Sequence, residues 1–197
     1  MPYQRFASED IDGVTHFKYM GRCQFHELQQ RIENKDFLKG SENLYLYGTS
    51  GSGKSHLLAA LAYHLVREGK RVFYIPDCYN LLLDSLRTMW DACHFAYYDS
   101  PKFGTIRDAD NVNTLIGFLA LDEDVYIIVD QVNVLEFTEN DPIREIKVQV
   151  LKWLNALRFR HRYIFSASAN ERSTREAYKK QHGISVIPTF GGMSPVC

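Results

Sequence analysis

A glycine-rich stretch in the first third of the chain has the residue types and spacing to hold phosphate. It reads Gly-Thr-Ser-Gly-Ser-Gly-Lys-Ser and matches the pattern G-x-x-x-x-G-K-[ST] at every position. Glycines let the backbone turn tightly enough for successive N–H groups to face an anion, and a following helix adds the positive end of its dipole. We expect the nucleotide phosphates to contact Gly48, Thr49, Ser50, Gly51, Ser52, Gly53, Lys54, Ser55 and His56.

A magnesium site is predicted beside this loop. Lys54 would supply a point charge to the β- and γ-phosphates, and the hydroxyl of Ser55 would bind Mg²⁺. The apolar run Val125 to Val129 ends in Asp130, which is the Walker B arrangement of a carboxylate at the end of a buried strand. Ser55 and Asp130 are therefore the predicted metal ligands. The simpler alternatives are a turn that only joins a strand to a helix, and an aspartate that only caps a loop.

Three polar residues complete the predicted catalytic set with Lys54 and Asp130. Gln131 stands where many ATPases with an extra strand between the two motifs carry glutamate. An amide cannot accept a proton, but it can orient water, and an unassisted GTPase of that kind turns over at only about 10⁻⁴ per second. Hydrolysis is thus expected to be slow, unless Gln131 is only a surface residue. Ser168 and Asn170 are candidates to contact the γ-phosphate or the water, and Asn170 could equally be a helix N-cap.

A basic stretch and two nuclease-like fragments are further candidate sites. Arg158, Arg160 and Arg162 could supply an arginine finger to a neighbouring subunit or bind nucleic acid, although such clusters are more often solvated helix ends. The net charge of −1 provides no general attraction for nucleic acid. The fragments Pro76-Asp77 and 145–147 do not form a nuclease site, because residues two apart on a helix diverge.

Short apolar runs alternate with helical patterns along the chain, which predicts how these residues are positioned. In the first half of the chain, the predicted elements are a strand 43–47, a helix 54–68 ended by Gly69, a strand 71–75, and a helix capped by Asp77 and continuing to Trp90. A region 91–110 that contains a loop or insertion follows, and then a helix 112–120 and a strand 125–129. The remaining elements are a helix opened by Asp141 and Pro142 and continuing to 157, a strand 163–166, a polar helix 171–181, and a segment 185–190 that is either a fifth strand or leads to a lid.

This alternation predicts a three-layer α/β/α P-loop NTPase fold with a mainly parallel central sheet. Residues 1–42 are expected to form an N-terminal extension with a helix, and residues 43–197 the core, cut before a C-terminal lid or effector domain. The chain has 197 residues, 45% of them hydrophobic and 24% charged, which suits one globular domain. The four cysteines show no metal-ligand spacing, and no apolar run reaches the length of a membrane span, so a soluble protein in a reducing compartment is expected.

Three longer segments extend beyond these motifs: YLYGTSGSGKSHLLAALAYHLVREGKRVFYIPDCYNLL, VYIIVDQVNVLE and KWLNALRFRHRYIFSASANERS. Together they closely resemble the NTPase module of crinkler-type effectors, which are proteins of filamentous eukaryotic microbes. Upstream, Tyr19 to Arg22 resembles the glycine-arginine box of AAA-type and STAND-type ATPases, with Cys23 in the place of the usual acidic residue. The resemblance implies a regulatory ATPase module that is joined to a secretion header and often to a nuclease-like domain, and that acts in the host nucleus.

The sequence therefore favours magnesium-dependent binding of ATP with slow hydrolysis. ATP is preferred over GTP because of the family resemblance and because no guanine-reading N-K-x-D segment is recognisable. Three alternatives stay open: a nucleotide-dependent interaction or assembly switch, which includes a homo-oligomer; a small-molecule or nucleotide kinase; and nucleic-acid binding through residues 158–162. No membrane partner is expected.

Overall fold

The central sheet of the protein is parallel throughout the residues that the structure describes. The structure is a computed structural model, and it describes residues 7–18, 23–34, 43–48, 51–122, 124–168 and 184–188. Within them the sheet has five strands in the order β4-β5-β6-β3-β7, and every neighbouring pair is parallel. The strands are β3 Asn43–Gly48, β4 Arg71–Ile75, β5 Val125–Val129, β6 Arg162–Ser168 and β7 Ile184–Pro188. The predicted fifth strand is thus confirmed, as β7 on the far side of β3.

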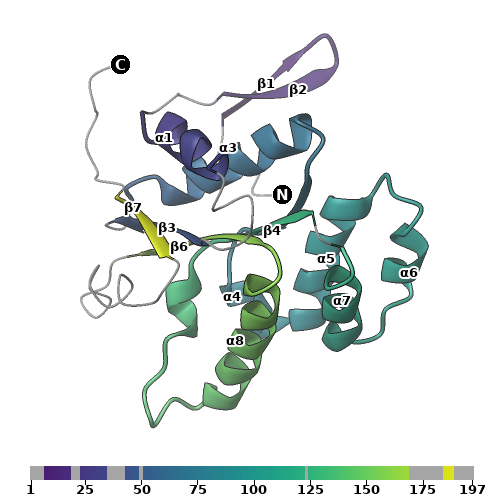
Figure 1. Cartoon of the computed structure of the whole chain (residues 1–197), viewed down its shortest axis with the longest axis vertical. Helices are drawn as coiled ribbons and strands as arrows, with labels where there is room; N and C mark the ends of the chain where they lie inside the picture. The colour runs from purple at the N-terminus through teal and green to yellow at the C-terminus, as the bar shows by residue number, and fades with distance from the viewer. Residues whose placement is uncertain are drawn as a thin grey trace.

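Helices cover both faces of this sheet, which confirms the predicted three-layer α/β/α architecture (Figure 1). One face carries α1 Cys23–Ile32 and α3 Lys54–Arg67, and the other carries α4 Tyr79–Leu83, α5 Ser85–Tyr97, α7 Val112–Leu119 and α8 Arg144–Arg158. The short helix α6 Phe103–Arg107 lies outside α5, and a 3₁₀ turn, η1 Val132–Leu135, follows β5. An antiparallel hairpin, β1 Ala7–Ile11 and β2 Val14–Lys18, precedes α1.

Two hydrophobic cores form because side chains alternate between the two faces along each strand. In β3, Leu44 and Leu46 join the core under α1 and α3, whereas Tyr45 joins the core under α5, α7 and α8. All five residues of β5 are buried, as expected of an interior strand with both faces covered. Leu28 of α1 is fully buried in the first of these cores, so the helix predicted within the N-terminal 42 residues packs on the sheet layer.

The helix that follows the glycine-rich loop ends as its sequence predicts. Gly69 has a φ of 72°, its N–H donates to the carbonyl of Val66 at 2.9 Å, and the N–H of Lys70 donates to the carbonyl of Leu65 at 2.9 Å. This pair of bonds is the Schellman motif, which satisfies carbonyls that the last helical turn leaves open. The left-handed conformation explains why glycine stands there.

The helix predicted from Asp77 to Trp90 is wrong, because two helices replace it. The helical conformation is interrupted at Asp84, which has an extended backbone. The Asp84 carboxylate accepts from the N–H of Arg87 at 3.0 Å. Asp84 therefore starts α5 with its own N-cap. Asp77 lies just before α4, where its Oδ1 accepts from the N–H of Tyr79 at 2.9 Å, and Cys78 is the cap residue.

The region 91–110, which is expected to contain a loop or insertion, also contains helix. Helix α5 continues to Tyr97, and α6 occupies Phe103–Arg107. The aromatic residues that obscured the pattern pack on one another: the His94 ring stacks on Trp90 at a centroid distance of 5.3 Å and meets Phe103 edge-on at 4.9 Å. The contact between His94 and Phe103 joins α5 to α6 across the turn between them, which helical periodicity alone does not reveal.

The predicted start of the last long helix, with Asp141 as N-cap and Pro142 as first residue, is two residues too early. Helix α8 begins at Arg144, and Asp141 forms a turn before it, with Oδ1 accepting from the N–H of Ile143 at 3.0 Å. The other oxygen of Asp141 pairs with Lys147 at 2.9 Å, which fixes the turn to the first turn of the helix. The remaining predicted strands and the helix 112–120 are confirmed within one or two residues, and the polar helix 171–181 lies outside the described residues.

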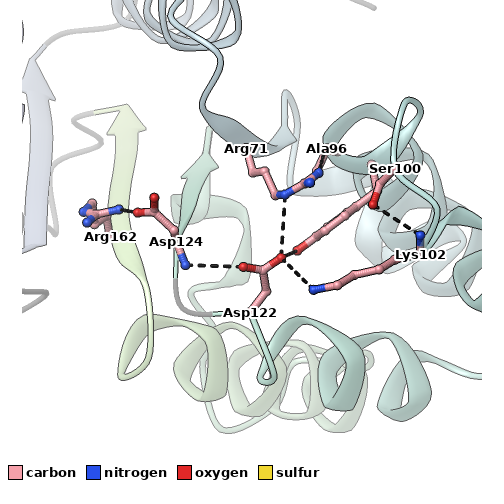
Figure 2. A network of polar contacts seen from close by, with 8 residues as sticks. Arg71, Ala96, Ser100, Lys102, Asp122, Asp124 and Arg162 are labelled. Carbon is pink, nitrogen blue, oxygen red and sulfur yellow. Dashed lines mark hydrogen bonds and ion pairs between the residues drawn. The ribbon is translucent and has the colours of Figure 1, made fainter.

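A polar network closes the sheet at the amino ends of β4, β5 and β6 (Figure 2). The Oδ2 of Asp122 accepts from the hydroxyl of Tyr97 at 3.0 Å and lies 3.5 Å from the ammonium of Lys102 and 3.7 Å from Arg71. Burial by itself would raise the pKa of Asp122, but these donors and cations together lower it. The network ties α5 and the turn before β5 to the sheet, on the edge opposite the glycine-rich loop.

In the described part of the chain, no helix is both long and apolar enough to span a membrane. Cys78 and Cys93 are buried free thiols, and burial raises the pKa of Cys93 to about 12.

Candidate phosphate-binding site

The candidate residues meet at the carboxyl edge of the sheet. Gly48, Ile75, Val129 and Ser168 each end a parallel strand, so the chain leaves the sheet at the same edge in all four places. In open α/β sheets this edge is where ligands bind. Strand β6 lies between β3 and β5, so one strand separates the glycine-rich loop from the strand that ends before Asp130.

The glycine-rich loop turns directly into α3. Gly51 and Gly53 have φ values of 77° and 85°, a region that costs other residues roughly 1–2 kcal/mol. Gly53 is the N-cap of α3, and its carbonyl accepts the first helical bond, from the N–H of Leu57 at 3.0 Å. The described part of the loop is therefore a compact turn at a helix N-terminus, the geometry that an anion needs. Thr49 and Ser50 lie outside the described residues.

Lys54 is held inside this turn. Its side chain is buried, with 5% exposed, and its ammonium donates to the carbonyl of Gly48 at 2.8 Å and to the hydroxyl of Ser52 at 3.3 Å. Burial lowers the pKa of Lys54, and the nearby Asp130 carboxylate opposes that shift. The ammonium thus lies within the loop, bonded to neutral oxygens that a phosphate could replace with a stronger, charge-assisted bond.

Asp130 is almost fully buried at the end of β5 and is held by two donors. Its Oδ1 accepts from the N–H of Gln131 at 2.9 Å and from the hydroxyl of Ser166. Ser166 belongs to β6, the strand between Asp130 and the glycine-rich loop. Ser166 is not among the site residues predicted from the sequence, although a serine among the apolar residues of a buried strand is itself a signal, because a buried hydroxyl needs a partner.

The residues present suit a magnesium ion. Mg²⁺ binds through one or two carboxylates and keeps several waters, and a carboxylate offers about four lone-pair positions, so the Asp130 carboxylate is a chemically suitable ligand. Ser55 lies in the first turn of α3, one residue after Lys54. Ser55 and Asp130 are the residues that would hold the ion, whose positive charge would neutralise charge on the phosphates.

The other predicted site residues are distributed around this edge. Gln131 is half-buried and has a φ of 61°, which turns the chain from β5 into η1. Ser168 ends β6 in register with Gly48, and His56 is exposed on the first turn of α3. Asn170 lies outside the described residues, as do Gly21 and Arg22 of the glycine-arginine segment.

The basic stretch lies at the opposite edge of the sheet. Arg162 begins β6, where its guanidinium pairs with Asp124 and lies 5.0 Å from the centroid of the Tyr126 ring. Arg158 is the last residue of α8 and is half-buried, whereas Arg160 is exposed. These side chains are thus separated from the glycine-rich loop of the same chain by the length of the strands.

The parallel sheet, the glycine-rich turn entering α3 and the buried aspartate two strands away define a P-loop ATPase-like domain. Residues 13–95 match the family model described as IstB-like ATP binding protein, which is less than half of the chain. That range includes the glycine-rich loop and ends before Asp130. No curated protein sequence matches the chain.

Several solved structures resemble the chain in part. The AMPPCP-bound DnaA from Aquifex aeolicus is 17% identical, with a TM-score of 0.47 over 86% of this chain and 48% of that chain. A replication initiator DnaA bound to AMPPCP and single-stranded DNA is 18% identical, with a TM-score of 0.47 over 83% and 46%. PCH-2 from C. elegans is 16% identical, with a TM-score of 0.42 over 83% and 39%. The chain spans about half the length of the DnaA structures.

Proposed function

We propose that the protein binds ATP with Mg²⁺ at the carboxyl edge of the sheet and hydrolyses it slowly. The observation that carries the proposal is the buried Lys54 ammonium inside the turn of Gly51 and Gly53, with the Asp130 carboxylate close enough to affect its pKa. The match of residues 13–95 to an ATP-binding family supports ATP as the nucleotide.

Each residue of the site would have one task. The loop amides and Lys54 would hold the phosphates, Ser55 and Asp130 would hold the metal, and Ser168 and Asn170 would contact the γ-phosphate or the water. Gln131 would orient the attacking water without taking its proton, which is the reason to expect slow turnover. A kinase reaction would need an acceptor site, and nothing in the described residues specifically favours one.

Calorimetric titration of the purified chain with ATP, ADP and GTP, with and without Mg²⁺, tests the binding. The Lys54→Ala protein is expected to bind Mg-ATP at least about tenfold more weakly, because each charge-assisted bond contributes about 1.5–3 kcal/mol. Lys152→Ala is the matched control, since Lys152 is exposed on α8. Equal affinity of the Lys54→Ala and Lys152→Ala proteins would overturn the proposed site.

Release of phosphate from Mg-ATP separates a slow ATPase from a switch. Turnover that exceeds the Lys54→Ala background supports hydrolysis, whereas tight binding without turnover favours a nucleotide-dependent interaction or assembly switch. Light scattering with and without nucleotide would then report whether assembly follows the bound state.

We also propose that this domain is the regulatory ATPase module of a crinkler-type effector, on the strength of the three segments that resemble that family. Under this proposal the full-length protein is secreted and reaches the host nucleus. Imaging of a tagged full-length protein during host contact tests it, and retention in the producing cell would contradict it.

A further inference from the structure

The residue after the Walker B aspartate, Gln131, cannot serve as a proton acceptor in this site. Attack of water on the γ-phosphate releases a proton, and the amide of Gln131 has no basic atom to accept it. Asp130 is committed to the metal in the proposed function. A second carboxylate at the same edge of the sheet would accept the proton.

Asp77 is such a carboxylate. It follows β4, the strand next to β5, and Ile75 of β4 is in register with Val129 of β5. Asp77 and Gln131 therefore both stand two residues beyond this matched pair. Neighbouring strands lie about 4.8 Å apart, so the two residues leave the sheet side by side.

Backbone bonds hold Asp77 against the Walker B segment. The N–H of Asp130 donates to the carbonyl of Ile75 at 2.9 Å, and the N–H of Cys78 donates to the carbonyl of Asp130 at 3.1 Å. The chain from Ile75 to Cys78 thus wraps around Asp130. The buried thiol of Cys78 senses both carboxylates: burial raises its pKa, and Asp130 and Asp77 raise it further.

Asp77 is also oriented and open to solvent. Its Oδ1 accepts from the N–H of Tyr79 at 2.9 Å, which fixes the carboxylate, and no other bond involves its side chain among the described residues. The residue is half-buried, so water can reach it. A positioned carboxylate with one oxygen in a hydrogen bond and the other accessible can act as a general base.

The strand order places three polar residues in sequence along this edge of the sheet. Starting from the glycine-rich loop on β3, they are Ser168 at the end of β6, Asp130 after β5 and Asp77 after β4. Asp77 therefore lies one strand farther from the loop than Asp130 does.

We propose that Asp77 is the general base for ATP hydrolysis in this protein, a role that rests on the proposed function. The water oxygen bonds to the γ-phosphorus as the bond from that phosphorus to the bridging oxygen breaks. ADP leaves with the electron pair, and the proton of the water passes to the Asp77 carboxylate, which later returns it to solvent. Gln131 orients the same water.

A structural role in the turn before α4 would also explain the bond to Tyr79, and one variant separates the two roles. Asp77→Asn keeps an oxygen that can accept from Tyr79 but cannot accept the proton. Asp84→Asn is the control, because the Asp84 carboxylate also accepts from a backbone N–H at a helix start, that of Arg87, but Asp84 follows α4 and not a strand. Gln131→Glu places a carboxylate beside Asp77 and serves as a rescue.

The experiment measures kcat, KM and the pH profile of ATP hydrolysis, together with the calorimetric affinity for Mg-ATP and the thermal midpoint. The proteins compared are the wild type, Asp77→Asn, Asp84→Asn, Gln131→Glu and the double variant Asp77→Asn with Gln131→Glu. Asp77→Asn is expected to lower kcat at least tenfold, because a general base typically accelerates a reaction by about 10²–10⁴-fold. It should also lose the acidic limb of the pH profile, with unchanged affinity and thermal midpoint. Asp84→Asn should keep the wild-type kcat, and the double variant should recover turnover.

Each contrary result has its own meaning. A kcat within twofold of wild type in Asp77→Asn overturns the assignment of the base. So does wild-type protein that binds Mg-ATP without turnover, although binding itself then stands. A wild type that fails to bind Mg-ATP overturns the proposed function as a whole.

Discussion

At the scale of single residues, the Asp130 carboxylate depends on a neighbour from another strand. The Ser166 hydroxyl donates to Oδ1 of Asp130, and both side chains are almost fully buried. A buried carboxylate is costly without hydrogen-bond donors, so this bond contributes both to stability and to the direction in which the second oxygen points.

Ser166→Ala is expected to raise the Mg²⁺ concentration that is needed for ATP binding. Loss of a hydrogen bond to a charged group costs about 1.5–3 kcal/mol, part of which would appear as a Mg²⁺ midpoint raised about tenfold. Titration of Mg²⁺ at fixed ATP measures this midpoint. Ser100→Ala is the control, since Ser100 is buried near the opposite edge and accepts from the N–H of Lys102. Equal midpoints in the two variants would show that Ser166 does not orient the metal carboxylate.

The candidate site could be predicted from the sequence to the extent that its residues are contiguous. Gly48 to Ser55 match a continuous pattern, and Asp130 ends a continuous apolar run. Ser166 and Asp77 could not be assigned roles in this way, because their importance arises from the pairing of β5 with β6 and with β4. Strand order is a long-range property that local spacing does not contain.

At the scale of elements, the residues at helix ends decide how accurately helix boundaries can be predicted from the sequence. The end of α3 is encoded by a single residue, Gly69, whose φ of 72° other residues adopt only with strain. The break between α4 and α5 depends on Asp84, which looks locally like one more polar residue on an apolar helix. A glycine such as Gly69 can be recognised in a sequence as the end of a helix. An aspartate such as Asp84 is harder to recognise, because the same residue could either cap a new helix or continue the preceding one.

Gly69→Ala should destabilise the protein by about 1 kcal/mol, because the left-handed conformation is strained for alanine. A Cβ built at Gly69 meets nothing within 4 Å, so the cost would come from the backbone alone. Gly117→Ala is the matched control: Gly117 lies within α7, and its Cβ also meets nothing within 4 Å. That change should stabilise by about 0.5–1 kcal/mol. Urea unfolding of both variants measures the two differences, and equal signs would refute the account of the helix end.

At the scale of the whole molecule, the two edges of the sheet are built differently. The carboxyl edge presents turns and polar groups toward the proposed ligand. The amino edge is closed by the Asp122 network and by His161, which is buried with 3% exposed. Neither ring nitrogen of His161 has a hydrogen-bond partner in the described part of the chain.

His161 should make the free energy of unfolding depend on pH. Burial lowers its pKa below 6.5, with Arg160 acting in the same direction and Asp122 opposing. As the pH falls below 6.5, the unfolded chain binds more protons than the folded one, so stability decreases until the folded pKa is passed. His161→Phe should remove this decrease and stabilise by about 1 kcal/mol.

Urea unfolding between about pH 5 and pH 7.5, the range in which histidine usually changes charge, measures this effect. His26→Phe is the control, because His26 is exposed on α1. An undiminished loss of stability toward acid in His161→Phe would assign the dependence to other groups.

The sequence by itself determined the phosphate-binding pattern, the alternation of strands and helices, and hence a parallel three-layer fold. Each of these is encoded by neighbours within about one element, through backbone geometry at glycine and through hydrophobic periodicity. Only the tertiary structure decided the strand order, the burial of Lys54, the pairing of Ser166 with Asp130, and the position of Asp77 beside Gln131. The reason is physical: these features are contacts between residues far apart in the chain, and they form only when the sheet assembles.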